Sequence, residues 1–409
     1  MLEELSRLLG LDGFAVTAVR ERGDELDLEV ELVVTAAVCL HCGRASVEIK
    51  ERPRVRVRDL PIAGRRTTLC WRKRRYRCEA CGRTFTESDQ QLPPRQRVTA
   101  RFRRHLFGRV RCGAAHAEVA REEETTRYQV EHAFRLGAAH ALAERTSEPA
   151  ARRLALDEAA HRRGSQALAT VVCDLDRRCV VDVVDGRNRR TIERYLRSLP
   201  RERRRAIEVV SIDPYEAYRQ AVRAALPAAR IVVDPFHLVR GANTALDSVR
   251  RERQRFVRQK RRTGARQTRG TAWRAELFHA RHRLLKARER LSERERRKLC
   301  ELFVAEPVLA EAWGLKEAFR SIYRAGDRAE AEGRLERFLA AAQRAAIPSF
   351  TAFANGLKGW RTQLLAYFEE PTTSGYAEGV INKIKTIKRR AYGLPSFPSF
   401  RSRVLVACV

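Results

Sequence analysis

From residue 153 onward, short apolar runs of strand length alternate with polar turns and helical stretches. Polar turns of a few residues join the first three runs, which predicts an antiparallel meander. Helical and strand patterns then alternate, and proline occupies the first turn of the second helix, as is common. The strands are expected at 153–157, 167–173, 179–184, 206–212 and 230–234, and the helices at 190–199 and 214–226.

A three-stranded meander followed by alternating helix and strand is the order of an RNase H-like mixed sheet. In that order the first and fourth strands are central neighbours, so Asp157 and Asp213 would meet at one edge of the sheet. Asp157 alone could be an ordinary strand-end acid, and Asp213 a helix cap before Pro214. Both acids fall in the positions that this sheet requires, which favours a shared site.

A third acid, Glu378, lies on a helical pattern near the C-terminus. Asn382, Lys385 and Arg389 follow it at i+4, i+7 and i+11 and form one polar stripe, while isoleucines occupy another face. A solvated network of i, i+4 pairs is the alternative. Three such carboxylates can converge to hold divalent metal in front of a phosphodiester.

The 164 residues between Asp213 and Glu378 exceed what one strand and one helix need. Residues 245–370 are therefore expected to form an all-helical insertion, with helical periodicity over 284–298 and 301–325. Residues 250–270 hold ten basic residues and one acid, which is usually a solvated charge run but here favours DNA contact. The DNA-contacting candidates are Arg255, Arg258, Lys260, Arg261 and Arg262, together with Lys388, Arg389 and Arg390 after the glutamate.

The N-terminal third contains two C-x-x-C knuckles separated by 35 residues: Cys39, Cys42, Cys78 and Cys81. Two such knuckles complete a closed four-thiolate zinc site, which is structural because no coordination position stays open. Strand patterns at 54–58 and 67–71 fill the gap with a hairpin. His41 is a possible fourth ligand, but inside a knuckle it is expected to face solvent. A chance pairing of thiols is the alternative to the zinc site.

Beyond a proline-rich linker at 93–95, a helical pattern at 98–110 precedes a helix pair at 115–122 and 126–134. The pair has the apolar spacing of a helix-turn-helix, with a threonine to cap its second helix. Arg127, Gln129 and His132 would then project toward base edges. An ordinary helical hairpin linking two domains is the alternative.

Composition agrees with a protein of several domains that binds a polyanion. The 409 residues carry a formal charge of +32, and 83 bases, all but ten of them arginine, face 51 acids. Such a surface attracts phosphate backbones. The alternative is that these charges are only solvated and bind no polyanion. No apolar run is long enough to span a membrane and the N-terminus lacks signal-peptide features, so a cytoplasmic protein is expected.

With these motifs in place, the chain resembles the DDE transposases of bacterial insertion sequences, of the ISL3 family, over nearly its whole length. The resemblance implies a multidomain α+β and α/β fold: a zinc ribbon (1–92), a helix-turn-helix (95–147) and an RNase H-like catalytic domain (150–409). Asp157, Asp213 and Glu378 match the catalytic triad. Asp234 and His237 match a further D-x-x-H motif, and we expect them, with Asn382 and Lys385, to surround the triad. A structural strand-end role for Asp234 and His237 is equally open.

The resemblance implies binding of transposon ends and target DNA, followed by metal-dependent cleavage and strand transfer. The three carboxylates would hold two Mg²⁺ (or Mn²⁺) ions about 3.5–4 Å apart, which activate the nucleophile and stabilise the leaving oxygen. Joining two ends favours a homodimer in the active complex. A catalytically inactive DNA-binding regulator and an RNase H-like nuclease without strand transfer are the alternatives.

Overall fold

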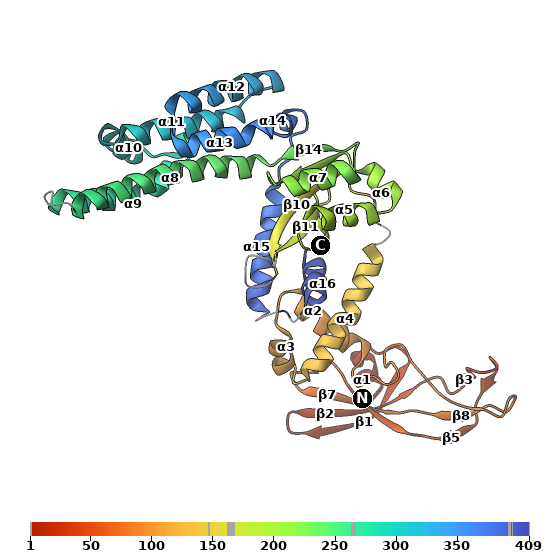
Figure 1. Ribbon diagram of the computed structural model, residues 1–409. Coiled ribbons are helices and arrows are strands. Elements are labelled where there is room, and N and C mark those ends of the chain that lie inside the picture. The colour runs from red at the N-terminus through yellow and green to blue at the C-terminus, as the bar shows by residue number, and fades with distance from the viewer. Residues whose placement is uncertain are drawn as a thin grey trace. The chain divides into compact units, whose positions relative to one another are not determined.

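The computed structural model describes residues 2–145, 148–161, 168–262, 267–391, 394 and 396–408, without the side chains of residues 2, 3, 5, 8, 257–262, 267–272 and 274. The chain divides into two compact units, each described by itself below (Figure 1). Unit 1 comprises Met1–Thr146 with Arg390–Gly393, and unit 2 comprises Ser147–Arg389 with Leu394–Val409. None of the helices in the described ranges has the length and hydropathy needed to cross a membrane.

Unit 1 begins with a four-stranded sheet that the hydrophobic pattern did not lead us to predict. Phe14 packs edge-on against Trp71 in its core, with the ring centroids 5.4 Å apart. The expected strands at 54–58 and 67–71 are confirmed as its last two members. The sheet order is β1-β2-β7-β6, from β1 (Phe14–Arg22), β2 (Glu25–Leu32), β6 (Arg54–Arg58) and β7 (Arg66–Arg72), and α1 (Leu2–Leu9) packs on β1.

The two knuckles lie in a small ribbon beside this sheet. Tyr76 and Phe85 stack at 5.5 Å and form its core with the buried Cys39 and Cys78. The ribbon consists of β3 (Ala37–Val38) with β4 (Ala45–Ser46), and of β5 (Ile49–Glu51), β8 (Arg75–Arg77) and β9 (Thr84–Thr86).

A buried ion pair joins the ribbon to the segment that follows β2. The guanidinium of Arg74 donates to Glu87 at 2.8 Å and to the carbonyl oxygens of Leu32 (3.0 Å) and Val34 (2.5 Å). Glu87 also accepts from the backbone N–H of Arg74 at 2.8 Å. Since both side chains are less than 5% exposed, this network replaces the water that the two charges lose.

Three helices complete unit 1: α2 (Ala100–Arg111), α3 (His116–Glu122) and α4 (Arg127–Glu144). Thr126 caps α4 as expected, accepting from the backbone N–H of Gln129. Val119, Val130 and Phe134 are buried where α3 meets α4. The turn between them takes its left-handed residue from Glu124 (φ 47°) rather than from glycine.

Unit 2 contains the five-stranded mixed sheet that the sequence predicts. Its order is β12-β11-β10-β13-β14, with antiparallel pairing from β12 to β10 and parallel pairing from β10 to β14. The strands are β10 (Arg153–Ala160), β11 (Leu168–Asp174), β12 (Cys179–Asp185), β13 (Val209–Ile212) and β14 (Arg230–Val233). β10 is longer than expected, so Asp157 lies within the strand rather than at its end.

Helices cover this sheet. Tyr218 of α7 is fully buried, and its hydroxyl lies 2.9 Å from that of Thr170 on β11. The covering helices are α5 (Arg189–Ser198) and α7 (Glu216–Ala225), with α16 (Phe397–Ala407) against β12. The short helix α6 (Arg201–Ala206), which has no buried residue, lies between α5 and β13 in the sequence.

The first helix after β14 begins at Pro235 and spans residue 245, where the helical insertion was expected to start. Figure 1 shows α8 running away from the sheet, and three of the helices that follow, α9, α11 and α13, pack against it. The helices of this region are α8 (Pro235–Arg262), α9 (Gln267–Leu285), η2 (Arg288–Arg290), α10 (Glu293–Ala305), α11 (Pro307–Ile322), α12 (Arg328–Ala345), α13 (Pro348–Lys358), α14 (Arg361–Leu365) and η3 (Ala366–Phe368). It leads into α15 (Gly375–Arg390).

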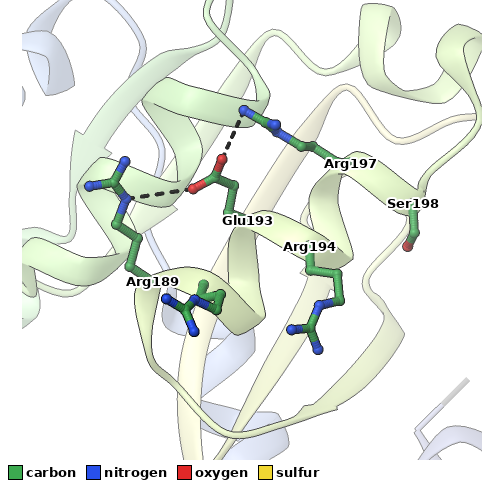
Figure 2. A pocket seen from close by; sticks show the side chains of 6 residues that line it. Arg189, Glu193, Arg194, Arg197 and Ser198 are labelled. Atoms are coloured by element: carbon green, nitrogen blue, oxygen red, sulfur yellow. Dashed lines mark ion pairs between the residues drawn. The ribbon is translucent and has the colours of Figure 1, made fainter.

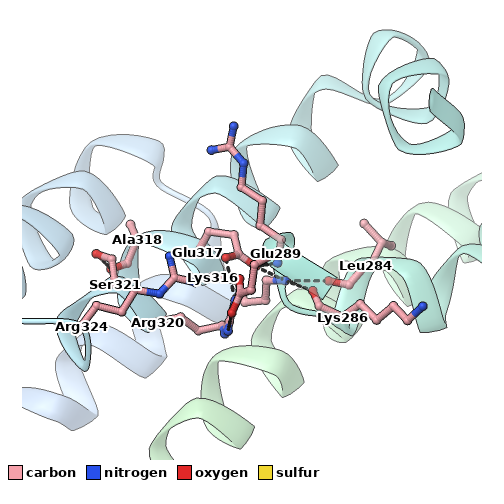
Figure 3. Close-up of polar contacts among 10 residues, drawn as sticks. Leu284, Lys286, Glu289, Lys316, Glu317, Ala318, Arg320, Ser321 and Arg324 are labelled. Atoms are coloured by element: carbon pink, nitrogen blue, oxygen red, sulfur yellow. Dashed lines mark hydrogen bonds and ion pairs between the residues drawn. The ribbon is translucent and has the colours of Figure 1, made fainter. Parts of the chain in front are cut away.

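The helical pattern over 284–298 is divided between α9 and α10, and a buried lysine lies at the end of α9. Lys316 of α11 donates to the carbonyl oxygens of Leu284 (2.9 Å) and Lys286 (2.8 Å), as Figure 3 shows. Ser292 then caps α10 through a capping box. The pattern over 301–325 is also divided between two helices, because α10 ends at Ala305 and α11 begins at Pro307.

Candidate functional site

Two of the three predicted acids meet in the centre of the unit 2 sheet. The parallel register pairs Leu156 of β10 with Ile212 of β13, so Asp157 and Asp213 each follow the last pair. Ligand atoms of Asp157, Asp213 and His237 all lie within 4.8 Å of one another. The sheet order therefore brings together two carboxylates that are far apart in the sequence, as predicted.

Both carboxylates are shielded from water. Burial raises the pKa of Asp157 above its usual range and raises that of Asp213 to about 7, while the nearby His237 opposes both shifts. A desolvated pair of like charges is stabilised by a cation between them. Carboxylate oxygens are the ligands that hard divalent cations prefer, so this donor set fits such an ion.

His237, in the first turn of α8, lies between two acids. Its Nδ1 is 3.0 Å from an oxygen of Asp213 and 3.0 Å from an oxygen of Asp234, the residue that follows β14. Burial by itself would lower the pKa of His237, but the hydrogen bond to Asp234 and the charge of Asp213 raise it above its usual value. Burial alone would raise the pKa of Asp234, but the hydrogen bonds that this carboxylate accepts from His237 and Ser374 hold its pKa below the usual range.

Asp234 also contacts Ser374, a residue that the sequence did not single out. The hydroxyl of Ser374 donates to Asp234 at 2.6 Å, and its backbone N–H donates to the other carboxylate oxygen at 3.4 Å. Ser374 immediately precedes α15 and is 4% exposed. A serine before a helical pattern signals an N-cap, but its partner, 140 residues away, leaves no local signal.

Glu378 lies in the first turn of α15 and is exposed. It is not part of the group formed by Asp157, Asp213 and His237. The helix has the predicted faces: Ile381, Ile384 and Ile387 are buried, while Asn382, Lys385 and Arg389 share the exposed side with Glu378.

The four knuckle cysteines converge as predicted, and His41 is exposed outside the group. The Sγ atoms of Cys39 and Cys81 are 3.8 Å apart, and those of Cys42 and Cys78 are 3.5 Å apart. Tetrahedral Zn–S bonds of about 2.3 Å place sulfurs about 3.8 Å apart, so the cluster fits zinc. A backbone hydrogen bond from Cys81 lowers the pKa of Cys78 to about 7, while the hydrogen bond that Cys42 shares with Cys78 raises the pKa of Cys42 to about 11, so Cys78 is the thiolate of this pair.

The predicted DNA-contacting residues differ in what their side chains do. On α4, Arg127 is exposed and His132 stacks on the exposed Tyr128, which the sequence interpretation overlooked. Gln129 completes the capping box of α4, which engages its side chain. Arg255, Arg389 and Arg390 are exposed, and Lys388 donates to the carbonyl of Ala160. The side chains of Arg258, Lys260, Arg261 and Arg262 lie outside the described part of the chain.

An additional basic surface lies on α5. A hollow of about 790 Å³ is lined by Arg189, Arg190, Glu193, Arg194, Arg197 and Ser198. Figure 2 shows the lining side chains. All four arginines are exposed. The sequence interpretation took this segment only as a helix of the fold.

The chain is similar to known proteins along nearly its whole length. Residues 154–404 match a family described as transposase, and residues 35–81 match one described as the zinc-finger of transposase IS204/IS1001/IS1096/IS1165. The transposase for insertion sequence element IS1001 of Bordetella parapertussis is 30% identical over 95% of this chain and 94% of its own length. The transposase for insertion sequence element IS1557 of Mycobacterium tuberculosis is 31% identical over 60% of this chain and 57% of its own length.

Proposed function

The chain belongs to the ISL3 family of DDE transposases of insertion sequences, and we propose that its DNA cleavage and strand transfer depend on Asp157, Asp213 and Glu378. The observation that carries the proposal is the meeting of Asp157 and Asp213 on neighbouring parallel strands. The position of Glu378 on an exposed helical stripe supports its role as the third acid.

We propose Mg²⁺, or Mn²⁺ in its place, as the divalent metal. Bound between the carboxylates, it would activate the attacking water or 3′-hydroxyl and stabilise the leaving oxygen. Asp157 and Asp213 supply oxygen ligands from the rigid sheet, and Glu378 adds a third ligand from α15. His237 and Asp234 would orient Asp213, while Asn382 and Lys385 would lie along the DNA backbone beside Glu378.

The proposed architecture is the RNase H-like order, which agrees with the sheet order β12-β11-β10-β13-β14. We further propose the boundaries 1–92, 95–147 and 150–409, the last with a helical insertion over 245–370. The α3–α4 pair would act as a helix-turn-helix, a role that Thr126 supports by capping α4. Zinc in the ribbon is structural, because four thiolates leave no ligand position open.

In DNA recognition, we propose that Arg127 and His132 contact the terminal repeats, together with Gln129 if the capping box opens. Arg255 and the bases that follow it on α8, together with Lys388, Arg389 and Arg390, would bind the phosphate backbone. Because two transposon ends are joined in one reaction, the active complex would be a homodimer on double-stranded DNA. Its place of action would be the bacterial nucleoid.

A supercoiled plasmid carrying the cognate ends tests this proposal in the presence of Mg²⁺. Wild type should cleave and join the ends, whereas Asp157→Ala, Asp213→Ala and Glu378→Ala should do neither while still binding them. Glu336→Ala, which removes an exposed acid of α12, is the matched control. Cleavage that survives any of the three substitutions refutes the triad. End binding without cleavage by wild type would indicate a regulator, and cleavage without joining a nuclease.

A further inference from the structure

Asp234 is a buried carboxylate that is shared by two distant segments. One of its oxygens accepts from Nδ1 of His237 at 3.0 Å and from the hydroxyl of Ser374 at 2.6 Å. The other oxygen accepts from the backbone N–H of Ser374 at 3.4 Å. The side chain is only 2% exposed, so these groups take the place of water. An acid that only stabilised the turn after β14 would need no partner 140 residues later in the chain.

Each partner of Asp234 leads to one acid of the proposed triad. His237 lies 3.0 Å from Asp213 through the same Nδ1 atom. Ser374 accepts, through its carbonyl oxygen, the backbone N–H of Glu378 at 2.9 Å. The path from Asp213 to the first turn of α15 therefore consists of four short polar contacts with Asp234 in the middle.

Resting on the triad proposed above, we propose that Asp234 is a positioning residue that couples the two halves of the site. Through His237 it fixes the orientation of Asp213 on the sheet. Through Ser374 it fixes the start of α15, and with it the range that Glu378 can reach. The separation of Glu378 from the other two acids gives this link its importance, because the third ligand must be delivered by a helix whose start is held at this point.

Ser374→Ala tests the link, because it removes the hydroxyl and leaves both acids in place. We expect cleavage to fall about 10- to 100-fold, the usual effect of losing a group that orients a metal ligand. End binding should stay at the wild-type value, and the lost hydrogen bond to the buried Asp234 should lower stability by about 1–3 kcal/mol, so cleavage is compared at a temperature where both proteins are folded. Ser374→Thr should restore most of the cleavage. Thr373→Ala, one residue earlier and exposed, is the matched control and should cleave normally.

A second readout is the affinity for Mn²⁺, followed by electron paramagnetic resonance on protein that retains its zinc. If Ser374 acts through Glu378, adding Ser374→Ala to Glu378→Gln should weaken Mn²⁺ binding no further than Glu378→Gln alone. Wild-type cleavage by Ser374→Ala, or additive losses of affinity, would overturn the coupling. Wild-type cleavage by Glu378→Gln would instead overturn the triad, so the two failures are distinct.

A second inference comes from the exposed surface of α5, which carries four arginines around one acid. Glu193 pairs with Arg197 at 2.8 Å and with Arg189 at 3.5 Å, as drawn in Figure 2. Arg190 and Arg194 make no hydrogen bond or ion pair with any residue in the described ranges. The surface therefore keeps an excess of three positive charges, and two guanidinium groups are unengaged.

We infer that this surface binds the phosphate backbone of double-stranded DNA. Guanidinium groups present paired N–H donors that match phosphate oxygens, and a polyanion relieves the repulsion among four neighbouring cations. The exposed and shallow setting suits a backbone that passes over the helix. Because backbone contacts carry no base information, the surface would bind DNA of any sequence.

The salt dependence of binding to DNA without the terminal repeats tests this inference. Each phosphate contact contributes about 0.9 to the slope of log affinity against log salt, so Arg190→Ala/Arg194→Ala should lower the slope by about 1.8. Arg296→Ala/Arg297→Ala on α10 removes the same charge from another exposed helix and should leave the slope unchanged. An unchanged slope for the α5 variant, or an equal fall in both variants, would overturn the inference.

Discussion

Glu87→Ala should destabilise unit 1 severely, because it leaves the guanidinium of Arg74 buried without its counter-charge. The wild-type side chains are 4% and 3% exposed, and their shortest contact is 2.8 Å. Removing one partner of a buried pair costs about 3–5 kcal/mol. Arg74 keeps its bonds to the carbonyl oxygens of Leu32 and Val34, so we expect the lower end, about 3 kcal/mol. For a unit of this size, that lowers the unfolding midpoint by roughly 6–12 °C.

Differential scanning calorimetry measures this shift with an internal control. The substitution lies in unit 1, so the transition of unit 2 should stay at its wild-type temperature. Arg74→Met/Glu87→Leu should recover only part of the loss: it leaves no unpaired charge, but the carbonyl oxygens of Leu32 and Val34 lose their donor. A shift of less than about 2 °C for Glu87→Ala, with zinc still bound, would refute the reasoning.

Further expectations concern the zinc site and the helical insertion. Cys39→Ser/Cys78→Ser should lose about one Zn²⁺ per chain by metal analysis, and unchanged zinc would refute the four-cysteine site. Burial lowers the pKa of Lys316 below its usual 10.5, so between the two values the unfolded chain binds more protons than the folded chain. The free energy of unfolding in urea should therefore rise with pH in this range for wild type relative to Lys316→Met. The same pH dependence in both proteins would contradict this. Gly241→Ala should destabilise by about 1–3 kcal/mol, because the new Cβ would lie 2.6 Å from the ring of Phe353 on α13. Gly314→Ala has open space around its Cβ and should stabilise by about 1 kcal/mol. Equal changes in the free energy of unfolding would refute the packing argument.

Much of unit 2 was accessible from the sequence because its signals are local. Apolar runs of strand length predicted the strands. The order of the elements predicted that the first and fourth strands are neighbours. That order predicted the meeting of Asp157 and Asp213. The knuckle spacing likewise predicted the four-cysteine cluster, since two intervening residues place both thiols on one side of a turn.

Features that were missed depend on distant partners or on a pattern hidden by charge. Leu26, Leu28 and Val30 alternate strictly along β2, but the acids between them made the segment look like surface. The end of α9 depends on Lys316, about 30 residues later. The contact between Ser374 and Asp234 spans 140 positions, and neither residue indicates the other.

The junction between β14 and α8 has a mechanical consequence. α8 contains 28 residues, so at about 1.5 Å per residue it is a rod of roughly 40 Å. Its first turn contains His237, and Asp234 immediately precedes it. Such a rod acts as a lever: a tilt of about 5° around its first turn would move the far end by roughly 4 Å. A DNA molecule that pushed or held the far end of α8 would therefore transmit torque to the two side chains that touch Asp213 and the start of α15.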